Sequence, residues 1–180
     1  NFVDSNNYVE TLYRPFDKRF TLYTGNSRGL YSSPQPKIMN HFLNGSNLGL
    51  ITARSNKSNT CDHFYISKNI METKCGERTT QSALFPLYLY SKTTTQTSFL
   101  EKEVRTPNLN MEIVYKICKD LLMKFSPEKI ESEQEHLLTP IDLLDYIYAV
   151  LHSPSYREKY KEFLKIDFPR VPYPKNQRQF

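Results

Sequence analysis

The chain has 180 residues, 38% hydrophobic and 24% charged, which is enough apolar material for one packed domain and argues against wholesale disorder. It contains no apolar run near the roughly 18 residues of a membrane span, so we expect no membrane partner. The net charge is +5, and the excess lies in residues 1–107, with 13 Lys and Arg against 8 Asp and Glu; residues 108–180 hold 11 against 11. Nucleic acid is therefore the first partner to consider.

The first 107 residues are predicted to form short strands separated by polar turns. β-Branched and aromatic residues alternate over 9–13 and 20–23, and Pro15 between them indicates a bend. Pro36 suits the first turn of a helix over 36–43. Further strands are expected at 48–53, 63–66 and 83–90, and polar loops at 54–62, 72–82 and 91–98.

From residue 108 the apolar pattern becomes helical. Apolar residues recur at spacings of three and four from Ile113 to Phe125, and Asn110 suits the N-cap of that helix. Pro140 and Pro154 each suit the first turn of a further helix, and the proline-rich tail should be extended. We predict an α+β fold in a single domain over 1–180. A β-rich, mixed-sheet half (1–107) carries the polar loops, and a bundle of about three helices (108–180) follows it.

Motifs for phosphate binding and hydrolysis are absent from the sequence. It has no Walker A, G-x-G-x-x-G or H-E-x-x-H motif, and only five glycines. Asp62 followed by Glu72-x-Lys74 imitates the metal-binding motif of a nuclease. One such triplet is expected by chance among this many acids and lysines, so the match carries no information. We expect no catalytic residues in this chain.

The histidines and cysteines do not form a recognisable metal motif. A structural zinc site usually shows tight spacings such as C-x₂-C, whereas His41, Cys61, His63 and Cys75 are loosely spaced. We therefore expect no metal site. Three cysteines without framework spacing fit buried thiols in a reducing compartment, which favours a cytoplasmic protein.

Basic and amide side chains gather in or beside the predicted loops of the first half. Lys and Arg meet DNA phosphates, and Arg, Asn and Gln on adaptable loops can reach base edges. Surface loops are polar in any protein, so the set carries more weight than any one member. The residues we predict to contact DNA are Arg14, Lys18, Arg19, Arg28, Lys37, Arg54, Asn56, Lys57, Lys74, Arg78, Gln81 and Lys92.

Several long strings, in a fixed order, resemble those of a known family. They are YRPFDKR at 13–19, NLGLI at 47–51, FPLYLY at 85–90, DYIYAVLHSP at 145–154 and FLKIDFPRVP at 163–172. The chain resembles the C-terminal target recognition (specificity) domain of single-polypeptide restriction–modification enzymes of the Type ISP and related Type IIG kinds. The resemblance extends over about residues 13–172.

The resemblance implies a larger, bacterial parent protein, in agreement with a sequence that starts at Asn1 rather than Met. Such enzymes place this domain after an adenine-N6 methyltransferase domain that uses S-adenosylmethionine, and they need Mg²⁺ for cleavage. Double-stranded DNA and the methyltransferase domain of the same polypeptide are the implied partners. The N-P-P-Y motif that would hold the adenine is absent from these 180 residues, so we expect the chain to be non-catalytic and without a cofactor of its own.

Two other functional interpretations remain open at this point. The chain could be a protein-interaction or structural module without sequence-specific DNA binding, whose basic loops serve only solubility. It could also be a free-standing hydrolase with a site at Cys61, His63 and Cys75. Sequence-dependent, salt-sensitive DNA binding would separate the first reading from a recognition domain.

Overall fold

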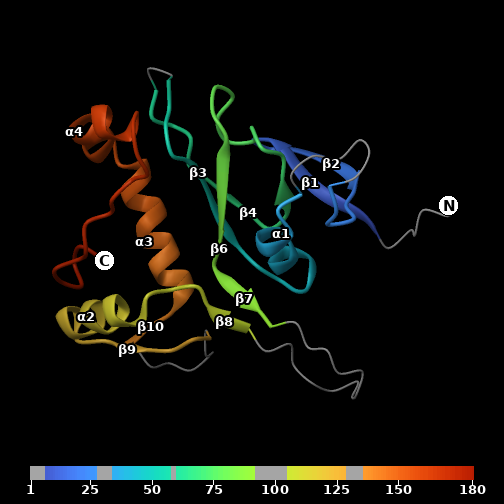
Figure 1. The fold of residues 1–180 in the computed structure, drawn as a ribbon. Coiled ribbons are helices and arrows are strands. Elements are labelled where there is room, and N and C mark those ends of the chain that lie inside the picture. Colours follow the sequence, from blue (N-terminus) through green and yellow to red (C-terminus); the bar gives the residue numbers. More distant parts are fainter. Residues whose placement is uncertain (1–6, 28–33, 58–59, 92–104, 129–135) are drawn as a thin grey trace, which may run out of the picture.

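The computed structural model describes residues 7–27, 34–57, 60–91, 105–128 and 136–180. It has the predicted α+β fold, with small sheets in the first half and most of the helices in the second (Figure 1). Among these residues, no helix is long and apolar enough to cross a membrane. The elements in chain order are β1 (Tyr8–Arg14), β2 (Asp17–Leu22), α1 (Pro36–Leu43), β3 (Gly49–Ala53), β4 (Tyr65–Ser67), β5 (Ile70–Met71), β6 (Ser82–Pro86), β7 (Tyr88–Tyr90), β8 (Arg105–Pro107), α2 (Met111–Leu121), β9 (Lys124–Phe125), β10 (Leu137–Leu138), α3 (Pro140–His152) and α4 (Pro154–Leu164).

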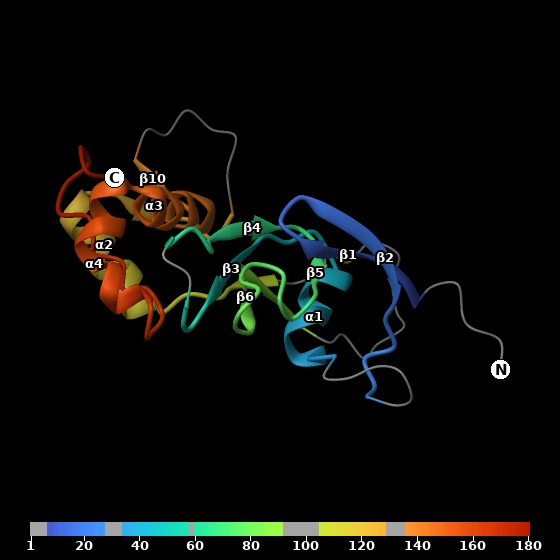
Figure 2. The ribbon, with the colours of Figure 1, turned by 90° about the horizontal axis from the view of Figure 1, so that it is seen from above.

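An antiparallel sheet in the order β4-β3-β6 forms the centre of the molecule and is covered on both faces. Because successive strand residues point to opposite faces, β3 contributes to two cores. Ile51 packs with Leu12 of β1 and Phe42 of α1, whereas Leu50 packs with Leu151 of α3. Figure 2 shows the resulting layers, with α3 and α4 on one side of the sheet and α1 with the β2-β1-β5 sheet on the other.

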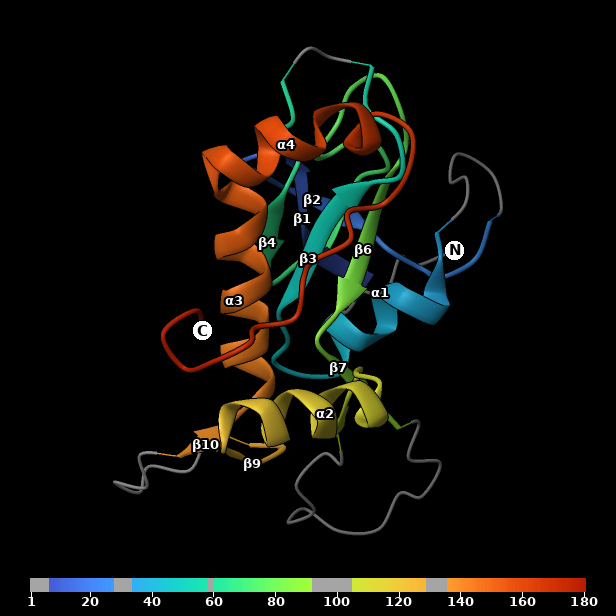
Figure 3. The same cartoon turned by 90° about the vertical axis from the view of Figure 1, so that its left-hand side faces the viewer.

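Helix α2 builds a smaller core at the opposite end of α3 from α4 (Figure 3). Val114, Ile117 and Leu121 of α2 pack with Leu138 of β10 and with Leu143 of α3. The chain returns to this core at its last residues, where the Gln177 amide donates to the Leu121 carbonyl at 2.9 Å. The helical half is therefore fixed to the sheet at one end and closed by the tail at the other.

The helix starts agree with the predicted Asn110 cap and with the predicted prolines, and a further cap is present at α3. The Asn110 side chain accepts hydrogen bonds from the backbone N–H groups of Glu112 and Ile113, which satisfies two donors that a helix leaves free. Thr139 and Asp142 form a reciprocal capping box at the start of α3. Proline occupies the first turn of α1, α3 and α4, as predicted.

Two predicted elements have different bounds in the structure. The strand predicted over 83–90 is divided into β6 and β7, because Pro86 has no N–H to continue a ladder and the buried Asn47 side chain pairs with the backbone of Tyr88 instead. The helix predicted to reach Phe125 ends at Leu121. Leu122 takes a left-handed conformation (φ 55°) and is 84% exposed, and Phe125 lies in β9.

Gly49 allows the close approach of β3 and α1. A Cβ at this position would lie 2.5 Å from Cζ of Phe42 and 2.8 Å from Cδ1 of Leu84, both in the core. Since overpacking a core costs about 1–3 kcal/mol, we expect Gly49→Ala to lower the free energy of unfolding by that amount in denaturant titrations. Adding Phe42→Leu should recover part of the loss, because it shortens the ring that meets the new methyl group. Equal stability of Gly49→Ala and wild type would contradict this packing.

Candidate nucleic-acid interface

The register of the central sheet brings two of the predicted recognition loops to the same end. β3 and β6 are antiparallel with Ala53 opposite Ser82, so the chain leaves β3 where it enters β6. We call residues 54–57 and 72–81 the loop end; it lies at the top of the molecule in Figure 1, near the end of α4. Five predicted DNA-contacting residues are exposed there, namely Arg54, Lys57, Lys74, Arg78 and Gln81.

Hydrogen bonds and an ion pair hold the two loops against each other and against the β1–β2 hairpin. The Thr80 hydroxyl donates to the Ser55 carbonyl at 2.6 Å, which joins the two loops directly. Glu72 forms an ion pair with Arg14 of β1 and accepts a hydrogen bond from the backbone N–H of Lys74. The loops therefore have a defined shape without DNA.

Glu77 organises the turn that presents Arg78. Its carboxylate accepts hydrogen bonds of 2.6 Å from the backbone N–H groups of Thr79 and Thr80, and another from the Thr79 hydroxyl. Burial alone would raise the pKa of this carboxyl, but the hydrogen bonds from Thr79 and Thr80 outweigh it and lower the pKa below 4.5. The buried anion thus fixes the backbone on either side of the exposed Arg78.

The carboxylates of the second loop are used internally, which leaves its cations to the solvent. Glu72 is paired with Arg14, and Glu77 is held by threonines. Among the described residues, Lys57, Lys74 and Arg78 take part in no salt bridge. The loop end therefore presents positive charge flanked by polar side chains. A surface of this kind attracts a negatively charged polymer.

The predicted cations of the hairpin are arranged differently. Lys18 forms a salt bridge with Glu10 at 3.0 Å, and Arg19 forms one with Asp17 at 2.9 Å. Arg14, which pairs with Glu72, and Arg19 also lie over the ring of Tyr13, at 4.0 and 3.8 Å. These three cations are already neutralised within the protein.

Lys37 lies apart from the loop end. It is exposed on the first turn of α1, and the Tyr23 hydroxyl beside that turn donates to the Pro34 carbonyl. Tyr23 directly follows the last residue of β2. Lys37 therefore lies near the end of β2 that is farther from the β1–β2 turn. Two more predicted residues, Arg28 and Lys92, lie outside the described residues.

Asn56 was predicted to contact DNA, but its side chain is buried and has a structural role. It is 1% exposed, and its amide nitrogen donates to the Thr60 carbonyl and contacts Nδ1 of His63, both at 2.7 Å. Burial also lowers the pKa of His63 and so favours the neutral ring. Asn56 shapes the loop from inside, and we remove it from the candidates for base contact.

The segment after α4 adds charged residues that the sequence analysis did not select. Asp167 lies 3.5 Å from Nε of Arg54 and 3.8 Å from a terminal nitrogen of Arg170. Both arginine side chains are largely exposed, at 76% and 80%. Charge counts could not find Arg170, because its half of the chain is neutral, although it lies within the FLKIDFPRVP string.

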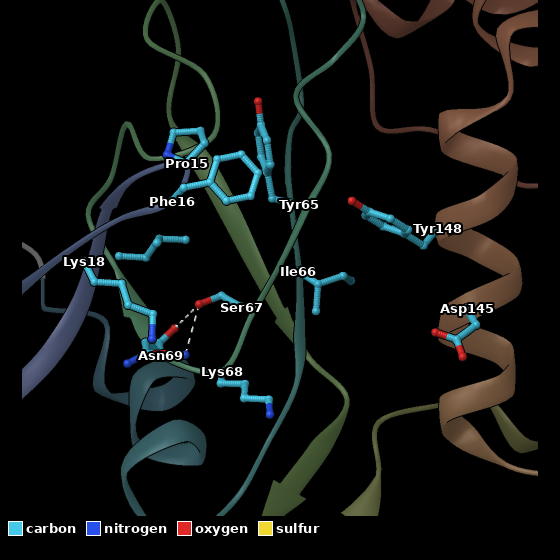
Figure 4. A pocket seen from close by; sticks show the side chains of 11 residues that line it. Pro15, Phe16, Lys18, Tyr65, Ile66, Ser67, Lys68, Asn69, Asp145 and Tyr148 are labelled. Atoms are coloured by element: carbon cyan, nitrogen blue, oxygen red, sulfur yellow. Dashed lines mark hydrogen bonds between the residues drawn. The ribbon is translucent and has the colours of Figure 1, made fainter.

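A groove of about 470 Å³ lies beside the loop end, between the β1–β2 turn and α3. In Figure 4, Phe16 and Tyr65 are on one wall and Asp145 and Tyr148 of α3 are on the other. Phe16 has a positive φ of 65° and is 94% exposed, which is unusual for a large apolar residue. The groove is mainly apolar, so it is distinct in character from the cationic surface of the loops.

The geometry does not support a cysteine–histidine site. Cys61 packs with α3 and α4, whereas Cys75 packs in the other core with Ile51. Burial raises the pKa of Cys75 to about 11, which keeps the thiol protonated and a poor nucleophile. Within the described part of the chain, no three His, Cys, Asp or Glu side chains come together to hold a metal ion.

The sequence model of the Type ISP C-terminal specificity domain matches residues 2–180. The chain belongs to this family. No curated protein matches the chain significantly.

Solved structures share the fold of this specificity domain. They include the ATP-dependent Type ISP restriction–modification enzyme LlaBIII bound to DNA (20% identity, TM-score 0.68) and the DrdV–DNA complex (22%, 0.67), each covering 97% of this chain. A nuclease-deletion mutant of the Type ISP enzyme LlaGI, in complex with a DNA substrate mimic, covers 93% (23%, 0.54). This chain spans only 10%, 14% and 12% of those three chains.

Glu77 provides a test of the loop organisation in this specificity domain. We expect Glu77→Gln to lower the free energy of unfolding at pH 7 by about 1–3 kcal/mol, because neutral Gln leaves buried donors poorly paired. The lowered pKa of Glu77 means that its contribution is present above pH 4.5 and is lost as the pH falls below that value. Denaturant unfolding between pH 7 and pH 3 should therefore show a smaller loss for Glu77→Gln than for wild type. The exposed Glu158→Gln is the control and should follow wild type; parallel profiles for Glu77→Gln and wild type would contradict the assignment.

Proposed function

We propose that this specificity domain recognises the target sequence in double-stranded DNA for a restriction–modification enzyme and is not itself catalytic. The observation that carries the proposal is the gathering of exposed Arg54, Lys57, Lys74, Arg78 and Gln81 at one end of a rigid sheet. The structures that share its fold are of enzymes in complex with DNA, which supports DNA as the partner.

The side chains of the loop end suit two kinds of contact. Lys57 and Lys74 are point charges without salt bridges among the described residues, which suits DNA phosphates. Arg78 can donate two hydrogen bonds to a guanine edge, and Gln81 can pair in the same way with adenine. Because Glu77 holds the turn between them, less conformational entropy is lost on binding than with a disordered loop.

The rest of the parent enzyme belongs to the same proposal. This chain spans about a tenth of the matched solved chains, which supports further domains in the parent. We place among them an adenine-N6 methyltransferase domain that uses S-adenosylmethionine and packs against this one, and a cleavage activity that uses Mg²⁺. Extrusion of the target adenine would fall to the methyltransferase, with this domain fixing the position on the duplex. The bacterial cytoplasm is the compartment that we assign to the whole enzyme.

Selection from a pool of randomised duplexes tests the function directly. The full-length protein should enrich one sequence motif, and its affinity for that motif should fall steeply with salt. Sequence-independent, salt-insensitive binding would instead favour the interaction-module alternative. The enriched motif then supplies the target duplex for the variants below.

Arg78→Ala and Gln81→Ala should relax the choice of sequence. Losing one bidentate base contact costs about 1–3 kcal/mol of discrimination, or roughly 5- to 150-fold. We expect the preference for target over non-target duplex to fall by this factor in competition binding, with a smaller change in non-target affinity. The exposed Lys119→Ala on α2 is the control, and it should keep the preference. An unchanged motif in both loop variants would contradict the assignment of these positions.

Lys57→Ala and Lys74→Ala should weaken binding to all sequences alike. Each lysine that neutralises one phosphate contributes about 0.9 to the slope of log K against log salt concentration. We expect each variant to reduce this slope by about one for target and non-target duplexes. Lys119→Ala removes the same charge from α2, away from the loop end, and should leave the slope unchanged (Figure 1). A similar reduction with Lys119→Ala would show a general charge effect rather than local contacts.

A further inference from the structure

Two arginines from opposite halves of the chain converge on one carboxylate at the loop end. Arg54 directly follows β3, and Arg170 lies in the segment after α4. Asp167 has one oxygen 3.5 Å from Arg54 and the other 3.8 Å from Arg170. The three groups carry a net charge of +1, so the cluster can accept one more anion.

These ion pairs are loose in comparison with a structural ion pair of the same chain. Arg105 donates two hydrogen bonds to Glu128, at 2.8 and 2.6 Å, and its side chain is 27% exposed. The contacts of Arg54 and Arg170 with Asp167 are longer than a good hydrogen bond, and both side chains are more than three-quarters exposed. Each guanidinium has five N–H donors, so most of their donor capacity faces solvent.

The backbone that carries this cluster is nevertheless held firmly. Phe168, next to Asp167, packs edge to face on Phe85 of β6 at 5.6 Å. The Arg170 carbonyl accepts a hydrogen bond from the buried Tyr156, and the N–H of Asn56 donates to the carbonyl of Lys165 at 3.2 Å. Rigid backbone with exposed, loosely paired side-chain ends is the arrangement expected of a preorganised ligand site.

We propose that Arg54 and Arg170 form a clamp for one DNA phosphate, which Asp167 occupies in the free protein. The proposal rests on the DNA-binding function and adds a contact supplied by the helical half. A phosphate presents two oxygens to a pair of guanidinium groups as the Asp167 carboxylate does, and the planar donors of Arg match either group. DNA then competes with Asp167 for the two arginines. Asp167 therefore weakens binding most for a non-target duplex, which lacks the base contacts that a target duplex makes.

Removing the charge of Asp167 tests the competition. In the full-length protein, Asp167→Asn should raise the affinity for a non-target duplex about three- to tenfold at low salt, as expected for one nearby charge. The preference for the target should fall accordingly. Glu162→Gln is the control, since it removes the same charge and one ion pair, that with Lys165, but touches neither arginine. Reduced affinity in Asp167→Asn, or an equal gain in Glu162→Gln, would overturn the proposal.

Arg170→Ala gives a second route that does not depend on Asp167. It should lower the slope of log K against log salt by about 0.9, whereas Arg178→Ala in the exposed tail should leave it unchanged. In an Arg54→Ala/Arg170→Ala background, Asp167→Asn should no longer raise the affinity. Equal slopes for Arg170→Ala and Arg178→Ala would overturn the clamp alone. A wild-type protein that binds no duplex would overturn the proposed function itself, so the two failures are distinguishable.

Discussion

The antiparallel pairing of β3 with β6 is the constraint on which the rest of this domain depends. Its register, with Gly49 opposite Pro86 and Ala53 opposite Ser82, decides which loops leave the sheet together. Because side chains alternate along a strand, a shift of one residue would turn the fully buried Ile51 out of its core. The same shift would change which residues of the two loops lie opposite each other at that end of the sheet. Core packing therefore fixes the position of the loop end.

Burial of the sheet on both faces makes the helices more than a passive support. His152 at the end of α3 contacts the Phe64 carbonyl at 3.1 Å, and Arg157 of α4 contacts the other ring nitrogen at 2.8 Å. Phe64 is fully buried next to His63, whose ring holds the Asn56 side chain. These contacts connect α3 and α4 to the loop that follows β3. The bundle determines the shape of that loop as well as the stability of the sheet.

The local features of the fold were predictable from the sequence, whereas the partners of polar side chains were not. Asn110, Thr139 and the prolines at helix starts act within one turn of chain, so their effect depends on little else. Arg14 and Asn56 looked equally suited to DNA, but one pairs with Glu72 and the other is buried. Both outcomes depend on residues brought close only by the folded sheet. The short strands β5, β8, β9 and β10 were missed for the same reason, since a two- or three-residue strand is defined by its partner.

Charge counted along the chain is a poor measure of the charge that a ligand meets. The basic half holds Arg14, Lys18 and Arg19 in ion pairs of its own, so a neighbouring carboxylate offsets each of these charges. The neutral half, in contrast, places the exposed Arg170 beside Arg54. The effective cationic surface is therefore built from both halves around the loop end. A net charge of +5 therefore understates the positive charge at the loop end, where the carboxylates are paired or buried and the cations are concentrated on one surface.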